Sequence, residues 1–285
     1  MELSNTETPV TVTEEAVPAV PAGRPRSRAQ ILAPVAVGLV FLGVWEFLVH
    51  YYQVRPFVLP APSSIIVSLF QNLGSLLGSL TFTLGITLLA FVLAVTGGVL
   101  LAILFSQSRM VEMALFPYAV MLQVTPVVAI APLIIIWVGV DNPGYAVLIL
   151  AWIVAFFPML SNTTLGLKST DHNLHNLFEL YGASRWQVLF QLQLPNAMPY
   201  ILAGMKISGG LALIGAVVAE FVAGSGSATG LAWRISEAGY RLQIPKMFAA
   251  LILLSVTGIC IFFLLSWLEY KLLHRWHESA AHREN

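Results

Sequence analysis

Two pairs of histidines are the side chains whose type and spacing come nearest to metal chemistry in this sequence. His172 and His175 lie three residues apart, as do His274 and His277. No cysteine or carboxylate joins either pair at ligand spacing, which favours solvated histidines over a zinc site. The lone Cys260 lies in an apolar run and can form no internal disulfide or cysteine cage. We therefore expect no metal site in this chain.

Glycine-rich segments give no nucleotide or cofactor site either. Residues 166–170 superficially resemble a phosphate-binding loop, but they lack an adjacent Gly-Lys pair and a preceding strand. The glycines between 224 and 230 have the wrong spacing for a dinucleotide fingerprint, and an external turn is favoured. A nucleophile elbow and paired inward carboxylates are also missing. The sequence thus predicts a protein that is not an enzyme and binds no cofactor on this chain.

The composition is that of an integral membrane protein. Hydrophobic residues make up 58% of the 285 residues and charged residues 10%, whereas about a quarter of the residues in a soluble domain are charged. Fourteen basic and fourteen acidic side chains cancel, so no overall charge attracts the chain to nucleic acid. Membrane lipid is the expected surroundings.

Charge-free intervals predict about six transmembrane helices, because a span needs roughly 20 apolar residues. The third interval contains Pro117, Pro126 and Pro132, so we expect a bent or broken element there. The fold class is therefore all-α. The expected spans cover about residues 31–52, 76–106, 113–140, 144–165, 196–221 and 247–270.

Lysine and arginine residues predict the orientation. With the first span starting inside, ten of them fall on or nearest one side, and four fall on the other: Arg55, Arg234, Arg241 and Lys246. The positive-inside rule makes the first side cytoplasmic, so both termini and the polar segment after the fourth span are expected there. We divide the chain into a disordered cytoplasmic tail (1–29), a membrane domain (30–275) and a second cytoplasmic tail (276–285).

We single out three charged residues within the expected spans, because an ionised group costs about 2.5–3.5 kcal/mol near a helix centre. Glu46 is in the outer third of the first span, Lys206 in the inner third of the fifth, and Glu220 at the outer end of the fifth. Each is close enough to an interface to be hydrated, and we favour a structural role for Glu46. Lys206 is expected to pair with a carbonyl or to reach the cytoplasm.

Small residues form a stripe along the fifth span, where Gly204, Ser208, Ala212 and Ala216, followed by Glu220, recur every four residues. Such a stripe lets two helix backbones approach closely in a membrane. Packing within the chain is the favoured interpretation, and contact with a second copy or a pore-lining face is left open.

The polar segment 179–199 separates two long apolar runs. Tyr181, Trp186, Phe190 and Leu194 recur at spacings of four and five, and polar residues fill other positions. This pattern predicts an amphipathic helix that lies across the membrane surface. Taken alone, it fits a docking helix and an interfacial helix without a partner equally well.

The spacing within this segment is similar to a known motif. Gly182 is followed by nine residues, then Leu192, one residue, and the pair Leu194-Pro195. It resembles the EAA loop of bacterial ATP-binding-cassette importer permeases. In that family, a Glu-Ala-Ala-x3-Gly-x9-Ile-x-Leu-Pro segment forms the cytoplasmic coupling helix, which inserts into a groove of the ATPase subunit.

The resemblance implies that residues 170–195 couple this chain to an ATPase, although the acidic start of the motif is displaced. The first Glu position falls on Asn176, and the nearest carboxylate, Glu179, lies three residues late. Leu194-Pro195 is expected to mark an abrupt boundary between the coupling helix and the fifth span. The expected coupling residues are Asn176, Glu179, Gly182, Ala183, Ser184, Arg185, Leu192, Leu194 and Pro195.

Further segments extend the resemblance over residues 45–276. Trp45-Glu46 with residues 59–63, and residues 125–133, 156–163 and 218–221, are similar to the nitrate, sulfonate and taurine branch, which also includes riboflavin and thiamine-precursor pyrimidine permeases. The resemblance implies a type I importer fold in the bacterial inner membrane, a second permease copy in a homodimer, an ATPase dimer that holds ATP and Mg, and an extracytoplasmic binding protein. It also places Glu220 beside the periplasmic mouth, in contact with the gate or the binding protein.

The expected function is therefore that of a transmembrane permease subunit of an ATP-driven importer. The cargo is either a heterocyclic vitamin or precursor (riboflavin, a pyrimidine) or a small anion (sulfonate, taurine, nitrate). Aromatic residues at 91, 137, 152, 156 and 157, with no cation at mid-depth, favour a neutral heterocycle slightly, although lipid-facing or packing positions are the favoured interpretation of these side chains. The main alternative is an ATP-independent six-helix carrier or channel. A third possibility, an intramembrane enzyme, would need a catalytic cluster at membrane depth, and the sequence shows none.

Overall fold

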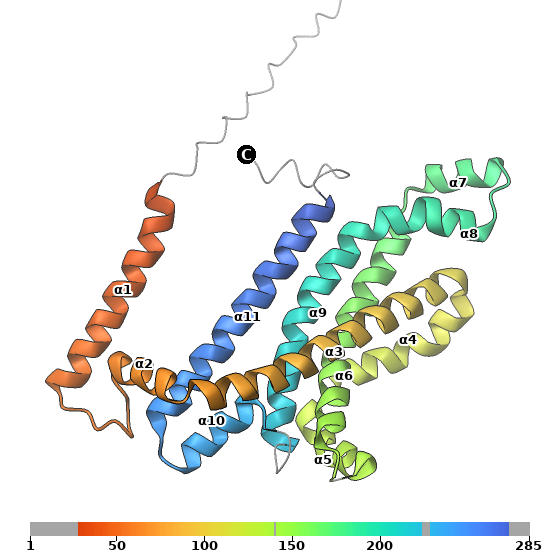
Figure 1. Cartoon of the computed structure of the whole chain (residues 1–285). Coiled ribbons are helices and arrows are strands. Elements are labelled where there is room, and N and C mark those ends of the chain that lie inside the picture. Colours follow the sequence, from red (N-terminus) through yellow and green to blue (C-terminus); the bar gives the residue numbers. More distant parts are fainter. Residues whose placement is uncertain (1–27, 140, 224–228, 274–285) are drawn as a thin grey trace, which may run out of the picture.

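The structure, a computed structural model, describes residues 28–139, 141–223 and 229–273 (Figure 1). Every regular element among these residues is helical. The two expected tails, residues 1–29 and 276–285, lie outside the described residues, except that Arg28 and Ala29 already belong to the first helix.

The described residues contain six apolar spans if one bent pair of helices is counted as a single span. Each of the five unbroken helices has the length and hydropathy to cross a bilayer, and each matches an expected span to within a few residues. The predicted all-α membrane fold is therefore confirmed. The five helices are α1 (Arg28–Tyr51), α3 (Leu73–Gln107), α6 (Pro143–Lys168), α9 (Leu194–Ala223) and α11 (Ile244–Leu273).

The third span is broken, as its prolines predicted. α4 (Arg109–Val124) and α5 (Val127–Val138) are bent by 103° relative to each other. Pro126 restricts the preceding Thr125 to an extended conformation, with φ −67° and ψ 124°, and this ends α4. The Thr125 hydroxyl donates to the Met121 carbonyl at 2.6 Å, and this carbonyl also accepts from the Thr125 amide at 3.0 Å, so both bonds close the end of α4.

The centre of the bundle consists of α6 and α9, with α3 packed against both. Glycines allow these backbones to approach closely. A Cβ added at Gly215 of α9 would lie 2.9 Å from the Cα of Ala151 in α6, and one at Gly98 of α3 would lie 3.0 Å from the amide nitrogen of Leu160. Because the opposing atoms are backbone, a larger residue at either glycine would force the helices apart.

The stripe of small residues on α9 lies inside this packed centre. Gly204, Ser208, Ala212, Ala216 and Glu220 are all buried, and α6 is the main neighbour of α9. A Cβ added at Gly204 would lie 3.0 Å from a side-chain atom of α6. The stripe therefore packs within the chain, which is the interpretation that the sequence favoured.

The two sides of the bundle carry different short helices (Figure 1). α2 (Pro62–Gln71) and α10 (Leu231–Tyr240) lie on one side, at the bottom of the view. The hairpin formed by α7 (His172–Leu180) and α8 (Arg185–Val188) lies on the other, together with the start of α1 and the end of α11. Neither α2 nor α10 was predicted, because each is a ten-residue helix and too short to cross a membrane.

Candidate functional site

The polar segment forms a helical hairpin and not the single amphipathic helix that the sequence predicted. α7 ends at Leu180, a turn covers residues 181–184, and α8 begins at Arg185. Tyr181 therefore belongs to the end of the first helix, whereas Trp186 and Phe190 lie on the second. The prediction that these aromatic residues share one helix face was wrong, because the chain reverses direction at Gly182 and hydrophobic periodicity does not reveal such a reversal.

Gly182 makes this reversal. Its φ of +66° lies in the left-handed region, which glycine adopts without steric cost, and a Cβ at this position would meet nothing within 4 Å. The Gly182 amide donates to the Glu179 carbonyl at 2.9 Å, and the Ala183 amide donates to the Phe178 carbonyl at 3.0 Å. These two bonds are the Schellman motif that closes a helix end. Conformation, and not lack of space, thus explains the glycine.

The second helix begins with a capping box. The Ser184 hydroxyl accepts from the Gln187 amide at 3.3 Å, and the Gln187 side-chain oxygen accepts from the Ser184 amide at 2.7 Å. Asp171 caps the first helix in a similar way, since its carboxylate accepts from the Asn173 amide at 2.9 Å. Both arms of the hairpin therefore have defined starting points, and the four-residue turn between them is fixed by backbone bonds.

The second arm continues directly into the fifth span. α8, a π-turn (η1, Leu189–Gln193) and α9 form one helical segment of 39 residues, Arg185–Ala223. The expected boundary at Leu194-Pro195 was therefore wrong. Proline normally interrupts a helix because it lacks an amide and its ring meets the carbonyl four residues back. Here the turn just before it bonds Leu194 to Leu189, five residues back, which changes the register ahead of Pro195.

Large apolar side chains on the hairpin are exposed. Leu180 and Tyr181 at the tip are each 85% exposed, and Trp186 and Phe190 on the second arm are 61% and 60% exposed. The Trp186 and Phe190 rings stack with their centroids 6.1 Å apart. In contrast, Leu189, which lies between them in the chain, is fully buried in the main core. Exposed apolar clusters of this kind on a polar segment are typical of a protein contact.

The expected coupling residues fall into two separate groups. One group surrounds the turn: Asn176, Glu179, Gly182, Ala183, Ser184 and Arg185. The other group lies at the base of the second arm, where Leu192, Leu194 and Pro195 line a groove that also contains Leu272 and Leu273 at the end of α11. The structure therefore brings the first group together at the tip and joins the second group to the membrane bundle.

Glu220 lies on the opposite side of the bundle, and its carboxyl group is buried at the start of α10. One oxygen accepts from the Thr83 hydroxyl at 2.7 Å and the other from the Ala232 amide at 3.0 Å. The Thr83 hydroxyl also accepts from the Leu231 amide at 2.9 Å. A Cβ at Gly230 would lie 2.1 Å from the carboxyl group, so a larger residue there would have to displace it from these bonds. Contact of Glu220 with a gate or binding protein stays a prediction.

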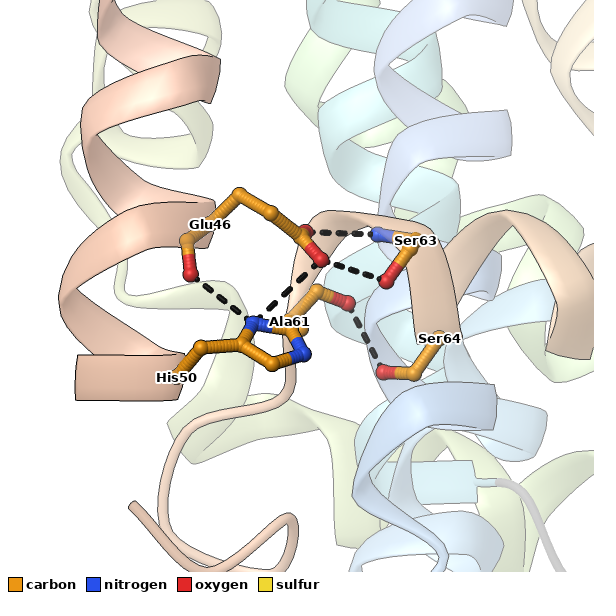
Figure 2. Close-up of polar contacts among 5 residues, drawn as sticks. All are labelled: Glu46, His50, Ala61, Ser63 and Ser64. Atoms are coloured by element: carbon orange, nitrogen blue, oxygen red, sulfur yellow. Dashed lines mark hydrogen bonds and ion pairs between the residues drawn. The ribbon is translucent and has the colours of Figure 1, made fainter. Parts of the chain in front are cut away.

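Glu46 holds the first two helices together, as Figure 2 shows. Its carboxylate accepts from the Ser63 amide at 3.0 Å and from the Ser63 hydroxyl at 2.7 Å, and His50 Nδ1 lies 3.5 Å away. Ser63 is in the first turn of α2, where the helix dipole favours a negative charge. Glu46 therefore has the structural role that we favoured from the sequence.

Lys206 has a partner that the sequence did not indicate. Its ammonium group lies 3.1 Å from a Glu269 carboxylate oxygen on α11 and 4.8 Å from the centre of the Phe262 ring. The sequence had instead predicted that Lys206 pairs with a carbonyl or reaches the cytoplasm. The two charges are 63 residues apart in the chain, so only folding reveals the pair.

His172 and His175 line a cavity beneath the hairpin. Within the residues that the structure describes, no group of three or more His, Cys, Asp or Glu side chains could hold a metal ion. His274 and His277 lie outside the described residues.

An apolar helical bundle whose central span runs into an exposed hairpin is typical of a membrane permease that a partner protein drives. Comparison with known proteins agrees. Residues 94–274 match the family described as the inner membrane component of binding-protein-dependent transport systems, and this chain belongs to that family. It is the permease subunit of an ATP-driven importer and not an independent carrier or channel.

Several curated relatives match nearly the whole chain. The riboflavin transport system permease protein RibX of Chloroflexus aurantiacus is 34% identical over 85% of this chain and 88% of its own. The putative aliphatic sulfonates transport permease protein SsuC of Bacillus subtilis is 33% identical over 84% and 86%. The formylaminopyrimidine transport permease protein ThiX of Halalkalibacterium halodurans is 32% identical over 86% and 96%. The nitrate, sulfonate and taurine branch is thus confirmed.

A solved structure shows the same fold. An amino acid ABC transporter chain described as crystallised with histidines superposes with a TM-score of 0.59, covering 72% of this chain and 97% of its own. The sequence identity is 20%, so the likeness concerns the arrangement of helices alone.

Proposed function

We propose that the α7–α8 hairpin is the part of this permease that receives work from the ATPase. The observation that carries the proposal is the unbroken helical segment Arg185–Ala223. A force applied to the exposed tip is transmitted along one rigid element to α9, which is packed against α6 and α3 at the centre of the bundle. A flexible linker would lose that motion, whereas a continuous helix moves the span directly.

The apolar tip supports docking on a protein surface. Leu180 and Tyr181 project from the turn, and their burial in a complementary groove would remove apolar surface from water. Neither side chain is needed for the fold, because both are 85% exposed. Aromatic anchors at the centre of an interface often contribute a large share of the binding energy.

The assembly that we propose contains two copies of this chain, two ATPase subunits and an extracytoplasmic binding protein. ATP and Mg would bind to the ATPase subunits. Closure of the ATPase dimer would move the two hairpins and open the outer side of the membrane bundle to the docked binding protein. In this arrangement the hairpin and both ends of the described chain face the cytoplasm, as the positive-inside rule predicts.

The cargo that we propose is a small neutral heterocycle. Lys206, the basic residue nearest the middle of a described span, is already paired with Glu269, which leaves it unsuited to hold an anion. The aromatic residues do not form one surface, because Phe156 is buried beside Trp152 in the core while Trp137 is 71% exposed. The paired state of Lys206 and the cargo named for the relatives RibX and ThiX make riboflavin and a formylaminopyrimidine the first ligands to test against the binding protein, with taurine as the anionic comparison. A protein that binds taurine alone would contradict this choice.

The test of coupling uses two equally exposed tyrosines. Tyr181 at the hairpin tip is 85% exposed and Tyr240 at the end of α10, on the opposite side, is 86% exposed. We expect Tyr181→Ala to weaken co-purification of the ATPase by about tenfold or more and to lower substrate-stimulated ATP hydrolysis. Tyr240→Ala should leave ATPase binding unchanged. Equal ATPase binding by both variants would show that the hairpin tip is not the docking point.

Orientation is tested separately. Asn173 is exposed on α7, so Asn173→Cys in a Cys260→Ser background provides a single reactive thiol on the hairpin. A reagent that cannot cross membranes should label it in inside-out vesicles and not in intact cells. Labelling from outside would place the hairpin on the wrong side for an ATPase.

A further inference from the structure

A cavity of about 770 Å³ lies beneath the hairpin, between α4, the ends of α3 and α6, and the start of α7. Its polar wall contains four basic side chains and one acidic one: Arg109, Lys168, His172, His175 and Glu112. The coupling mechanism described above uses none of these five. These side chains could therefore bind a ligand that is separate from the ATPase contact.

The positive charge of this wall is only partly neutralised. Lys168 forms an ion pair with Glu112, and these two charges cancel. Arg109 forms no hydrogen bond or ion pair with any residue that the structure describes, and the His172 and His175 rings likewise lack a described side-chain partner. A guanidinium group with its donors free, in a cavity wall that also contains two imidazoles, is suited to the oxygens of a phosphate group.

The opposite end of the same cavity is apolar. Phe116 and Pro117 follow Arg109 by seven and eight residues on α4, which places them about 10–12 Å further along the helix axis. Phe105 and Leu167 complete this end. The cavity therefore changes from cationic to apolar along α4, over a distance comparable to that between the headgroup and the first acyl carbons of a lipid.

We propose that this cavity binds an anionic phospholipid, with the phosphate against Arg109 and His172 and an acyl chain along Phe116 and Pro117. A soluble phosphate would use the cationic end alone, and an acidic protein segment would leave the apolar end without a partner. Basic pockets between helices on the cytoplasmic side are typical sites for anionic headgroups. The proposal rests on the cytoplasmic orientation proposed above.

The position of the site gives the lipid a mechanical role. A second cavity of about 370 Å³ adjoins it and is lined by Glu179, Ala183 and Arg185 of the hairpin turn, and both cavities share Ser106, His175 and Gln193. A lipid bound between α4 and α7 would thus connect the hairpin to the membrane bundle. Bilayers without anionic lipid should therefore support less uptake for each ATP hydrolysed.

The test compares two arginines in the complete importer, purified with its ATPase and reconstituted in nanodiscs. Arg109→Gln removes the unpaired guanidinium group of the cavity, and Arg55→Gln makes the same change at an exposed position on the opposite side of the bundle. Native mass spectrometry measures retained phosphatidylglycerol, with phosphatidylcholine as the neutral comparison. We expect Arg109→Gln to lower phosphatidylglycerol retention by about tenfold and Arg55→Gln to leave it unchanged.

Three results would overturn the proposal. Equal phosphatidylglycerol retention in both variants would place the lipid elsewhere. Displacement of the lipid by millimolar inorganic phosphate would identify a soluble-anion site. If the free permease retained phosphatidylglycerol and the complex with the ATPase did not, an acidic segment of the ATPase would occupy the cavity in the complex. Since lipid retention is measured without transport, such a failure is distinct from failure of the hairpin docking, which the Tyr181→Ala experiment reports.

Discussion

The buried contacts of Thr83 allow the attachment of α10 to be tested with one methyl-for-hydroxyl exchange. Thr83→Val keeps the shape of the side chain and removes its hydroxyl, which donates to Glu220 and accepts from the Leu231 amide. The change leaves one buried acceptor and one buried donor without these partners. At about 1–3 kcal/mol for each such group, the expected loss of stability at the start of α10 is about 2–6 kcal/mol.

Thr87 is a matched control one turn away on α3. Thr83 and Thr87 are 0% and 1% exposed, but the Thr87 hydroxyl donates only to the carbonyl of Thr83 at 2.8 Å, within its own helix. That carbonyl also accepts the regular helical bond, so Thr87→Val should cost less than about 1 kcal/mol. The two variants therefore differ in whether the connection to α10 is lost, and not in volume.

Hydrogen exchange provides a direct assay. The Leu231 and Ala232 amides bond to Thr83 and Glu220, so their protection reports the attachment. A loss of 2 kcal/mol predicts roughly thirtyfold faster exchange in Thr83→Val, with little change in Thr87→Val. Similar exchange of these two amides in both variants would refute the conclusion that Thr83 and Glu220 hold α10 to the bundle.

Two further predictions concern packing and the first helix. Gly215→Ala, whose new Cβ would lie 2.9 Å from the backbone of α6, should lower the free energy of unfolding by about 1–3 kcal/mol. Gly210→Ala, where a Cβ meets nothing within 4 Å, should leave that free energy unchanged or raise it. Detergent denaturation measures both variants, and equal effects would contradict the close α6–α9 contact. Glu46→Ala should free α1 from α2 and speed proteolysis of the connecting loop. Glu46→Gln keeps an acceptor for the Ser63 amide and should be cleaved more slowly than Glu46→Ala. Identical cleavage of the two variants would show that the carboxylate does not tether α1.

The membrane fold could be predicted from the sequence because burial in lipid imposes requirements on each segment separately. A span must be long, apolar and nearly free of charge, and these properties are visible without knowledge of any neighbour. The break in the third span was predictable for the same reason, since Pro126 and the residue before it are restricted locally. The Gly182 spacing indicated the family, although it did not indicate that the polar segment folds as a hairpin.

The partners of the charged residues could not be predicted in this way, because folding brings together positions far apart in the chain. Thr83 and Glu220 are 137 residues apart, and the Arg109 cavity combines residues from α3, α4, α6 and α7. The continuation of the helix through Pro195 also depended on tertiary structure. Local propensity favours a break there, but burial of Leu189 in the core accompanies a π-turn that accommodates the proline. The sequence by itself therefore determined which segments enter the membrane, and the tertiary structure decided which side chains meet and how the hairpin is joined to the bundle, because contacts between distant residues depend on the packing of whole helices.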